Sequence, residues 1–258
     1  MDILVLDTIH GGRELARHLE AAGHRVDAVD VYRGQEGIPA EVAMSRRYDR
    51  VIAPVHLDPD HPLLARGPVM SHHEAVGWIL EGKVPKPMIE ITGAQGKTTT
   101  AHALAHLMPG AGVLHTSRGT YRYPGRELLF KQSITPASVI EAARIARELD
   151  GWLVAEESIG VSGAGNLAIL TSAKDYPIAA GKKSALAERW KGVLRAPQSV
   201  LPTGCRVKHP GGIQVEDAVR CSGDECTYSW NGISGRFKNS LLALSAYREP
   251  ISLAAAAA

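Results

Sequence analysis

Short apolar runs alternate with longer amphipathic stretches in the N-terminal third of this chain of 258 residues. Such runs, bounded by turn residues, are typical of buried strands, whereas apolar positions three or four apart are typical of helices. The predicted strands lie at 3–6, 26–31, 49–54 and near Val69, and the predicted helices lie at 13–22 and at both ends of 62–80, with Trp78 facing inward. Strands and helices therefore alternate, which predicts an α/β, Rossmann-like domain over residues 1–85 on the substrate side.

A stiff, turn-rich connector at 82–87 follows, and it predicts a second domain over 86–258. Its predicted strands lie at 87–91, 112–115, 152–155 and 167–170, and a loop or hairpin is predicted at 117–131. Its predicted helices lie at 98–108, 136–149 and 183–194. Thr135 or Ser133 is expected to cap the second of these helices. The segment 200–247 alternates like an antiparallel set of strands. We therefore expect a mostly parallel sheet with additional antiparallel strands.

Leu253 is followed by five alanines, without a glycine or a polar cap. A helix that stops in this way predicts a domain that is incomplete at its end.

Composition excludes some classes of function. The chain has 29 basic and 27 acidic residues, interspersed along the sequence, so it has no electrostatic footprint for nucleic acid. It has no apolar run of membrane-spanning length and no secretory signal, which predicts a cytoplasmic protein without a membrane partner. The three cysteines, Cys205, Cys221 and Cys226, are odd in number and lack the Cys-x-x-Cys spacing of a zinc site, so they are expected to be reduced structural thiols. A metal pair at 221 and 226 needs ligands from elsewhere.

The segment 87–108 combines a predicted strand, two glycines, a lysine and several hydroxyl groups, in that order. Gly93 and Gly96 can adopt backbone angles that point successive N–H groups into one concavity, where the next helix places its positive end. Lys97 then reaches the terminal phosphates of a nucleotide, and Thr98 offers a hydroxyl ligand to its Mg²⁺. The predicted nucleotide-binding residues are Thr92, Gly93, Ala94, Gln95, Gly96, Lys97, Thr98 and Thr99.

This loop departs from the full phosphate-loop pattern, which has a glycine five positions before Gly96, where Ile91 stands here. The alternative is that Gly-Lys-Thr only opens a helix, with Lys97 in solvent. Because the strand, the two glycines, the lysine and the hydroxyl groups all fit a phosphate-binding loop, we favour phosphate binding.

Acidic residues follow the next predicted strands. Ligands of α/β sheets gather beyond the carboxyl ends of strands, so Glu156, Glu157 and Ser158 are expected to face the phosphate loop. One carboxylate then lies near the Mg²⁺, although two adjacent acids can also simply end a strand in solvent. Asp175 either acts on the metal through water or caps the turn at Tyr176.

Basic residues gather in the predicted hairpin, where guanidinium forks can bind substrate carboxylates; these residues are Arg118, Arg122, Arg126 and Lys131. A solvated basic face is the alternative. His10, in the turn after the first strand, is a further candidate substrate contact. His102 and His106 lack the glutamate of a His-Glu-x-x-His zinc site and are expected on a helix surface.

Together these residues resemble the Mur ligase family, whose members use ATP to activate a carboxylate as an acyl phosphate and then pass it to a nucleophile. Segment 92–100 is similar to the family's short phosphate loop, 134–136 to its Thr-Pro segment, 156–158 to its Glu-x-Ser, and 58–64 to part of its N-terminal domain. The resemblance implies ATP and Mg²⁺ as cofactors, with Thr98 and Glu156 holding the metal and Lys97 and Glu156 in catalysis.

Other positions depart from the family. Members usually have an Asp-His pair whose histidine binds a second Mg²⁺, whereas this chain has Asp175-Tyr176. Lys191 stands where many members carry a carbamylated lysine, which implies a catalytic role for it. The family's C-terminal domain has no counterpart here and is expected to be absent or truncated.

Within the family, segment 7–12 is most similar to the archaeal coenzyme F(430) synthetase branch. This resemblance implies activation of a propionate on a nickel tetrapyrrole, followed by closure of a carbocyclic ring, with Arg118, Arg122 and Lys131 binding other carboxylates. Two alternatives stay open. One is a Mur or folylpolyglutamate-type ligase that adds an amino acid. The other is a non-catalytic nucleotide-binding protein, which Tyr176 and the missing third domain favour.

Overall fold

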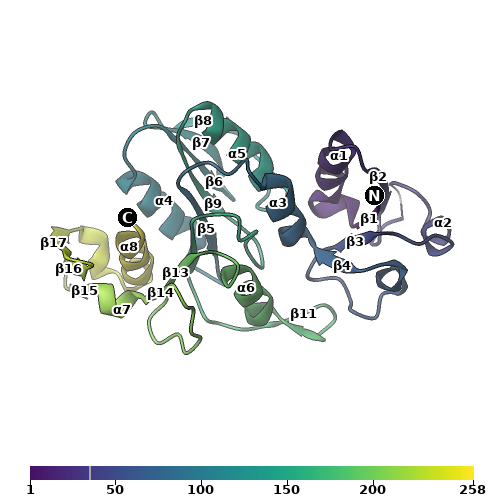
Figure 1. Cartoon of the computed structure of the whole chain (residues 1–258). Helices are drawn as coiled ribbons and strands as arrows, with labels where there is room; N and C mark the ends of the chain where they lie inside the picture. Colours follow the sequence, from purple (N-terminus) through teal and green to yellow (C-terminus); the bar gives the residue numbers. More distant parts are fainter. Residues whose placement is uncertain (35) are drawn as a thin grey trace.

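Four parallel strands form the N-terminal sheet of the computed structural model, which describes residues 1–34 and 36–258 (Figure 1). In the order of the sheet they are β2 (Arg25–Val29), β1 (Asp2–Leu6), β3 (Arg50–Ala53) and β4 (Val69–Ser71). The helices between and after them are η1 (Thr8–Gly12), α1 (Arg13–Ala21), α2 (Ala40–Met44), η2 (Pro62–Arg66) and α3 (His72–Leu80). The predicted strand–helix alternation is confirmed.

A second sheet has eight strands in the order β14-β13-β10-β5-β9-β6-β7-β8. Its parallel strands are β5 (Met88–Thr92), β6 (Gly112–Thr116), β9 (Trp152–Glu156), β10 (Leu167–Leu170), β13 (Gln198–Leu201) and β14 (Gly212–Gln214). The hairpin β7 (Gly119–Tyr123) and β8 (Glu127–Phe130) adds two antiparallel strands at one edge. The α/β fold class is confirmed.

Helices cover both faces of this sheet (Figure 1). Its alternating side chains point to two cores: Met88 lies in the cluster under α3 and α5 (Ser138–Glu148), and Ile89 in the cluster under α4 (Lys97–Leu107) and α8 (Ser245–Ala257). Helix α6 (Ala185–Val193) packs on β10 and is preceded by the small hairpin β11 (Pro177–Ile178) and β12 (Lys183–Ser184).

The two sheets share a hydrophobic cluster, because α3 lies between them and packs against both α1 and α5. Ile3 of the first sheet and Leu153 of the second both belong to this cluster. The division of the chain at residues 85 and 86 stays a prediction, since the core continues across it.

The segment 200–247 is only partly as expected. The antiparallel expectation is wrong for β13 and β14, which continue the main sheet in parallel, because a period of two sets the faces of a strand and not its direction. It holds for β15 (Val219–Ser222), β16 (Glu225–Trp230) and β17 (Ile233–Lys238). The short helices α7 (Val215–Ala218) and η3 (Ser240–Ala243) flank these strands.

Two local expectations are wrong. Cys221 and Cys226 form a disulfide rather than two reduced thiols, because the β15–β16 register places them opposite each other, whereas Cys205 is free and buried. Neither Thr135 nor Ser133 caps α5, because the chain closes a turn first. The Ser138 hydroxyl donates to the Thr135 carbonyl oxygen over 2.6 Å.

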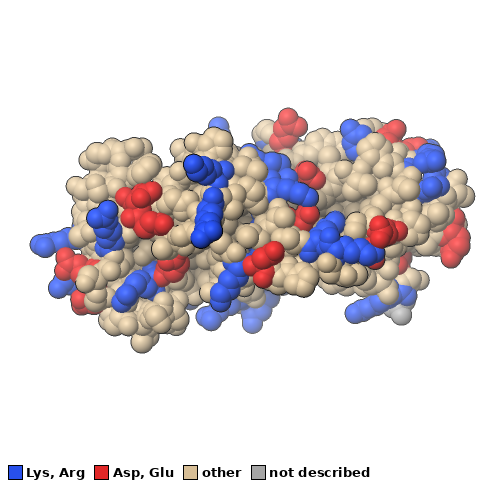
Figure 2. Space-filling model, turned by 90° about the horizontal axis from the view of Figure 1, so that it is seen from below, with Lys and Arg blue, Asp and Glu red and all other residues tan. Residues whose placement is uncertain are grey.

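Charged side chains of both signs occur along the whole length of the face in Figure 2. Within the described residues, no helix combines the length and the apolar character that crossing a membrane requires.

Candidate active site

The carboxyl ends of four neighbouring parallel strands meet at the candidate site. Strand β10 is followed by Thr171, β5 by the loop 93–96 and β6 by Ser117, and β9, which lies between β5 and β6, ends in Glu156. Helix α4 begins at the end of this loop, so its positive end points to the same place. Parallel sheets bind ligands at this edge, which is where the sequence predicted the nucleotide.

The glycines of the loop are required by its backbone. Gly93 has φ of 151° and Gly96 has φ of 85°, angles that other residues rarely adopt. A Cβ atom on Gly93 would lie 2.2 Å from the Thr171 hydroxyl oxygen. That hydroxyl donates to the Gln95 carbonyl oxygen at 2.6 Å, and so it fixes the loop from the neighbouring strand. The sequence analysis missed Thr171, although a hydroxyl just after an apolar strand is a usable signal.

Thr98 and Glu156, the two predicted metal ligands, are in contact. The Thr98 hydroxyl lies 3.1 and 2.9 Å from the two Glu156 carboxylate oxygens. The Ser117 backbone N–H donates to the same carboxylate at 3.2 Å, and the Ser117 hydroxyl oxygen lies 3.3 Å from that of Thr98. Two hydroxyls and one carboxylate form an oxygen-only set that suits Mg²⁺, so the residues fit the ion. Ser117 was missed by the sequence analysis.

Lys97 lies at the same cluster. Its ammonium group donates to the Gly93 carbonyl oxygen at 3.0 Å and lies 4.0 Å from a Glu156 carboxylate oxygen. Burial lowers the pKa of Lys97, the Glu156 carboxylate opposes that change, and Arg189 adds to it. A half-buried cation at the start of a helix, beside a metal-binding carboxylate, is suited to contact transferring phosphate oxygens.

Glu157 does not face the loop, so this part of the expectation is wrong. Successive residues of an extended chain point to opposite faces, and Glu157 is buried beside Glu90 on the other side. Burial, and then the neighbouring Glu90, raises the pKa of Glu157 well above its usual range. The backbone of Ser158 is bound away from the loop: its carbonyl oxygen lies 2.9 Å from Nε2 of the buried His73.

The remaining loop residues have several roles. The Thr92 hydroxyl accepts a hydrogen bond from the Gly160 backbone over 3.1 Å, and the Gln95 side chain accepts one from Lys174 over 3.0 Å. Ala94 and Thr99 are half-buried. Thr92 therefore stabilises the start of the loop through its contact with Gly160, and Gln95 contacts the segment that follows β10.

The predicted substrate residues do not converge on one point. Arg118 and Arg126 border a groove of about 1120 Å³ beside Thr98, α4 and α8, whereas Arg122 lies 3.6 Å from Glu127 within the hairpin. Lys131 is exposed after β8, and His10 lies in η1, after the first strand of the N-terminal sheet and beside Asp7.

Asp175 caps the segment that leads into α6. Its carboxylate accepts hydrogen bonds from the Tyr176 backbone at 2.8 Å, the Ser184 hydroxyl at 2.8 Å and the Leu186 backbone at 2.9 Å. These bonds lower the pKa of Asp175. Of the two roles expected for Asp175, the structure shows the capping of the turn at Tyr176.

Lys191 lies on α6, where its ammonium group is 2.7 Å from a Glu188 carboxylate oxygen. Both residues line a cavity of about 210 Å³ between the N-terminal sheet and α6. The same cavity is bordered by Lys183, Arg195 and Glu74, and Arg195 lies 3.4 Å from a Glu74 carboxylate oxygen, so the charged groups of the cavity are of both signs.

Comparison with known proteins identifies relatives. The chain is 38% identical over 231 residues to a coenzyme F(430) synthetase from Methanosarcina acetivorans, with 77% of this chain and 49% of that protein covered. A second coenzyme F(430) synthetase, from Methanocaldococcus jannaschii, is 26% identical over 226 residues, with 77% and 51% covered. The chain is thus similar in sequence to two coenzyme F(430) synthetases.

The Mur ligase resemblance inferred from the sequence is thereby confirmed, on the side of the coenzyme F(430) synthetase branch. A UDP-N-acetylmuramoylalanine–D-glutamate ligase from Parasynechococcus marenigrum is also 29% identical over 127 residues, which cover 40% of this chain and 27% of that protein. The chain spans about half the length of the coenzyme F(430) synthetases that it matches.

Solved structures give a weaker likeness. The match to a UDP-N-acetylmuramate:L-alanyl-gamma-D-glutamyl-meso-diaminopimelate ligase from Neisseria meningitidis covers 99% of this chain and 92% of that one, at 14% identity and a TM-score of 0.49. A pseudomurein peptide ligase from Methanothermus fervidus gives 16% identity and a TM-score of 0.46, with 99% and 66% covered. No protein-family model matches the chain.

Proposed function

We propose that the chain carries the ATP- and Mg²⁺-binding part of an ADP-forming ligase that activates a carboxylate as an acyl phosphate. The observation that carries this proposal is the contact of Lys97, Thr98 and Glu156 at the phosphate loop. Similarity to the coenzyme F(430) synthetases supports it independently.

Each residue has a distinct role in this proposal. Thr98 and Glu156 hold Mg²⁺, which supplies charge neutralisation for the nucleotide when it is bound. Lys97 and the loop N–H groups bind the phosphate oxygens and stabilise the charge that develops when the terminal phosphoryl group moves to the carboxylate. Ser117 and Thr171 orient Glu156 and the loop, respectively. Catalysis then rests on positioning and electrostatics.

The substrate that we propose is a propionate-bearing nickel tetrapyrrole, since coenzyme F(430) synthetase is the name of the relatives. Activation of one propionate and attack by a carbon of the same molecule forms a ring with net loss of water. His10, Arg118, Arg122 and Lys131 stay proposed substrate contacts, and Lys191 a proposed catalytic residue. A cytoplasmic location, where ATP is available, is part of the same proposal.

Nucleotide binding is the first test, because it needs only the site described above. The protein is titrated with Mg-ATP by calorimetry, beside Lys97→Ala and the control Lys208→Ala, which removes an exposed lysine between β13 and β14. A hydrogen bond to a charged group contributes about 1.5–3 kcal/mol, which corresponds to roughly 10–100-fold in affinity. We expect a loss of similar size for Lys97→Ala and none for the control. Equal affinities for Lys97→Ala and the parent protein contradict the proposal.

Product analysis distinguishes the ligase alternatives. The protein is incubated with Mg-ATP and the nickel tetrapyrrole acid, and ADP, phosphate and product mass are measured. Loss of one water from the substrate supports ring closure, whereas the added mass of an amino acid supports a Mur or folylpolyglutamate-type ligase. Tight Mg-ATP binding without substrate-dependent ADP release supports the non-catalytic alternative.

A further inference from the structure

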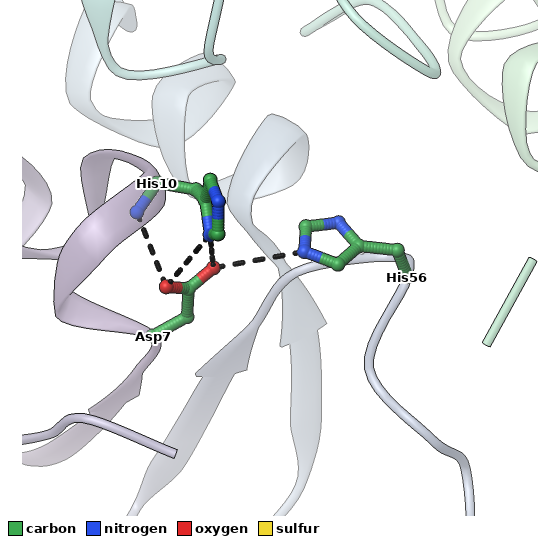
Figure 3. A group of neighbouring side chains, drawn as sticks. All are labelled: Asp7, His10 and His56. Atoms are coloured by element: carbon green, nitrogen blue, oxygen red, sulfur yellow. Dashed lines mark hydrogen bonds and ion pairs between the residues drawn. The ribbon is translucent and has the colours of Figure 1, made fainter. Parts of the chain in front are cut away.

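A second cluster of ligating groups lies on the N-terminal sheet, away from the phosphate loop. Asp7, His10 and His56 each offer one ligand atom, and these atoms all lie within 4.8 Å of one another (Figure 3). Asp7 directly follows β1, and His56 comes shortly after the neighbouring parallel strand β3. The cluster therefore occupies the carboxyl edge of the first sheet, where α/β sheets bind ligands.

Asp7 is held rigidly at the centre of this cluster. Its side chain is fully buried, and its Oδ1 atom accepts hydrogen bonds from the Ile9 and His10 backbone N–H groups, both over 3.1 Å. Its backbone has φ of 71°, in the left-handed region that is strained for a residue with a side chain. Strain of this kind persists where the surrounding structure fixes a functional geometry.

Both imidazoles face the other carboxylate oxygen of Asp7. The His10 Nδ1 atom lies 2.8 Å from Oδ2, which is a hydrogen bond, and the His56 Nε2 atom lies 3.7 Å from the same oxygen, which is too long for one. Figure 3 shows the two rings directed at the carboxylate from two different elements, His10 above it and His56 beside it. A hydrogen-bonded Asp7–His10 pair that only fixes the turn accounts for the first ring. The His56 ring packs against the rings of Tyr32 and His10, with centroids 6.0 and 5.5 Å away, and in this packed position its Nε2 atom is directed at the carboxylate.

The chemistry of the three groups selects a class of ligand. Imidazole nitrogens are common metal ligands in proteins, and each of the two rings directs one nitrogen toward the Asp7 carboxylate. Two imidazole nitrogens with one carboxylate oxygen suit transition metals rather than Mg²⁺. His10 is exposed and His56 is half-buried, so an ion at this point is reachable from solvent.

We propose that Asp7, His10 and His56 form a binding site for a divalent transition-metal ion. The site is separate from the oxygen-only set at Thr98 and Glu156, and it goes beyond the proposed ligase activity. Its three protein ligands leave coordination positions for solvent or for a donor atom of a bound molecule.

The test uses Co²⁺ and Zn²⁺ as probes, without nucleotide. Binding of Co²⁺ is followed by its visible absorption and binding of Zn²⁺ by calorimetry, in the parent protein, His10→Ala, His56→Ala and the control His106→Ala. His106 is an exposed histidine on α4, so its replacement matches the chemistry of the change without touching the cluster. We expect one bound ion in the parent and the control. Affinity in His10→Ala and His56→Ala should fall by at least the ~10–100-fold that loss of an outer-shell partner already costs.

Two outcomes overturn this proposal: no Co²⁺ binding by the parent protein, or equal binding by His56→Ala and the parent, with circular dichroism showing that each variant is folded. Lys97→Ala separates this site from the ligase site, because it should keep the ion while it loses Mg-ATP. Failure of metal binding with normal Mg-ATP binding thus counts against this site alone.

Discussion

The Thr98 hydroxyl donates to the Glu156 carboxylate over 2.9 Å, although 58 residues separate the two in the chain. The contact forms because β5 and β9 are neighbours and parallel, so the helix start after one strand meets the last residue of the other. A hydroxyl and a carboxylate of this kind can exchange their mutual hydrogen bond for a shared Mg²⁺ ion.

Thr98→Ala is therefore expected to weaken Mg²⁺-dependent nucleotide binding. A hydrogen bond or ligand contact to a charged group contributes about 1.5–3 kcal/mol, which corresponds to roughly 10–100-fold in affinity. Thr98→Ser keeps the hydroxyl and should stay close to the parent protein. The measurement is a calorimetric ATP titration at several Mg²⁺ concentrations. An unchanged Mg²⁺ requirement in Thr98→Ala would falsify the metal role of this hydroxyl.

Ser117→Ala should have a smaller effect than Thr98→Ala. The variant loses the Ser117 hydroxyl, 3.4 Å from a Glu156 carboxylate oxygen, but it keeps the backbone N–H that donates to the same oxygen at 3.2 Å. At 3.4 Å this hydroxyl contact is longer than a usual O–H···O hydrogen bond, so it should contribute about 1 kcal/mol, and a several-fold loss of Mg-ATP affinity is expected. The same titration measures it. A loss as large as that of Thr98→Ala means that Ser117 itself binds the metal.

The sequence predicted the parts of the site that are local in the chain. Gly93, Gly96, Lys97 and Thr98 lie within one strand–turn–helix pattern, and Glu156 ends an apolar strand of its own. Ser117 and Thr171 were missed because their place depends on which strands are neighbours. Apolar periodicity identifies a strand and its buried face, but it carries no information on the order of strands in a sheet.

The same reason explains the errors elsewhere. β13 and β14 were expected to be antiparallel, since alternation looks the same in either direction. Glu157 was expected at the loop beside Glu156, yet neighbours on an extended chain face opposite ways, and only the packed sheet shows which of the two points to the nucleotide.

Gly93→Ala should destabilise the protein more than Gly110→Ala. Both glycines have positive φ, 151° and 72°, which residues with a side chain rarely adopt, so each substitution introduces backbone strain on the order of 1–3 kcal/mol. A Cβ on Gly110 meets no atom within 4 Å, whereas one on Gly93 lies 2.2 Å from the Thr171 hydroxyl oxygen. Gly93→Ala should therefore lower Tm further and also weaken Mg-ATP binding. Thermal unfolding with and without Mg-ATP measures both effects, and equal Tm values for the two variants contradict the close packing of the loop.

Glu157→Gln should remove a pH dependence of stability. Burial raises the pKa of Glu157 above its usual 4.5, so folding favours the protonated acid. The stabilising contribution of the protonated Glu157 to the free energy of unfolding is complete below pH 4.5. It is lost as the pH rises from there toward the raised pKa, because Glu157 ionises in the unfolded chain first. Glutamine has the shape of the neutral acid and does not ionise.

The variant should thus unfold at a higher temperature than the parent at about pH 8 and at nearly the same temperature at about pH 5. Each unit by which the pKa is raised corresponds to about 1.4 kcal/mol, and 1 kcal/mol shifts Tm by about 2–4 °C in a protein of this size. The buried His72 and His73, whose pKa values fall to about 4 and about 3, destabilise both proteins equally as the pH drops below 6.5, so the difference in Tm isolates Glu157. The control is Glu81→Gln, which changes an exposed glutamate in the same way. If the difference in Tm between the parent and Glu157→Gln stays constant from about pH 5 to about pH 8, Glu157 is ionised in the folded protein and the prediction is wrong.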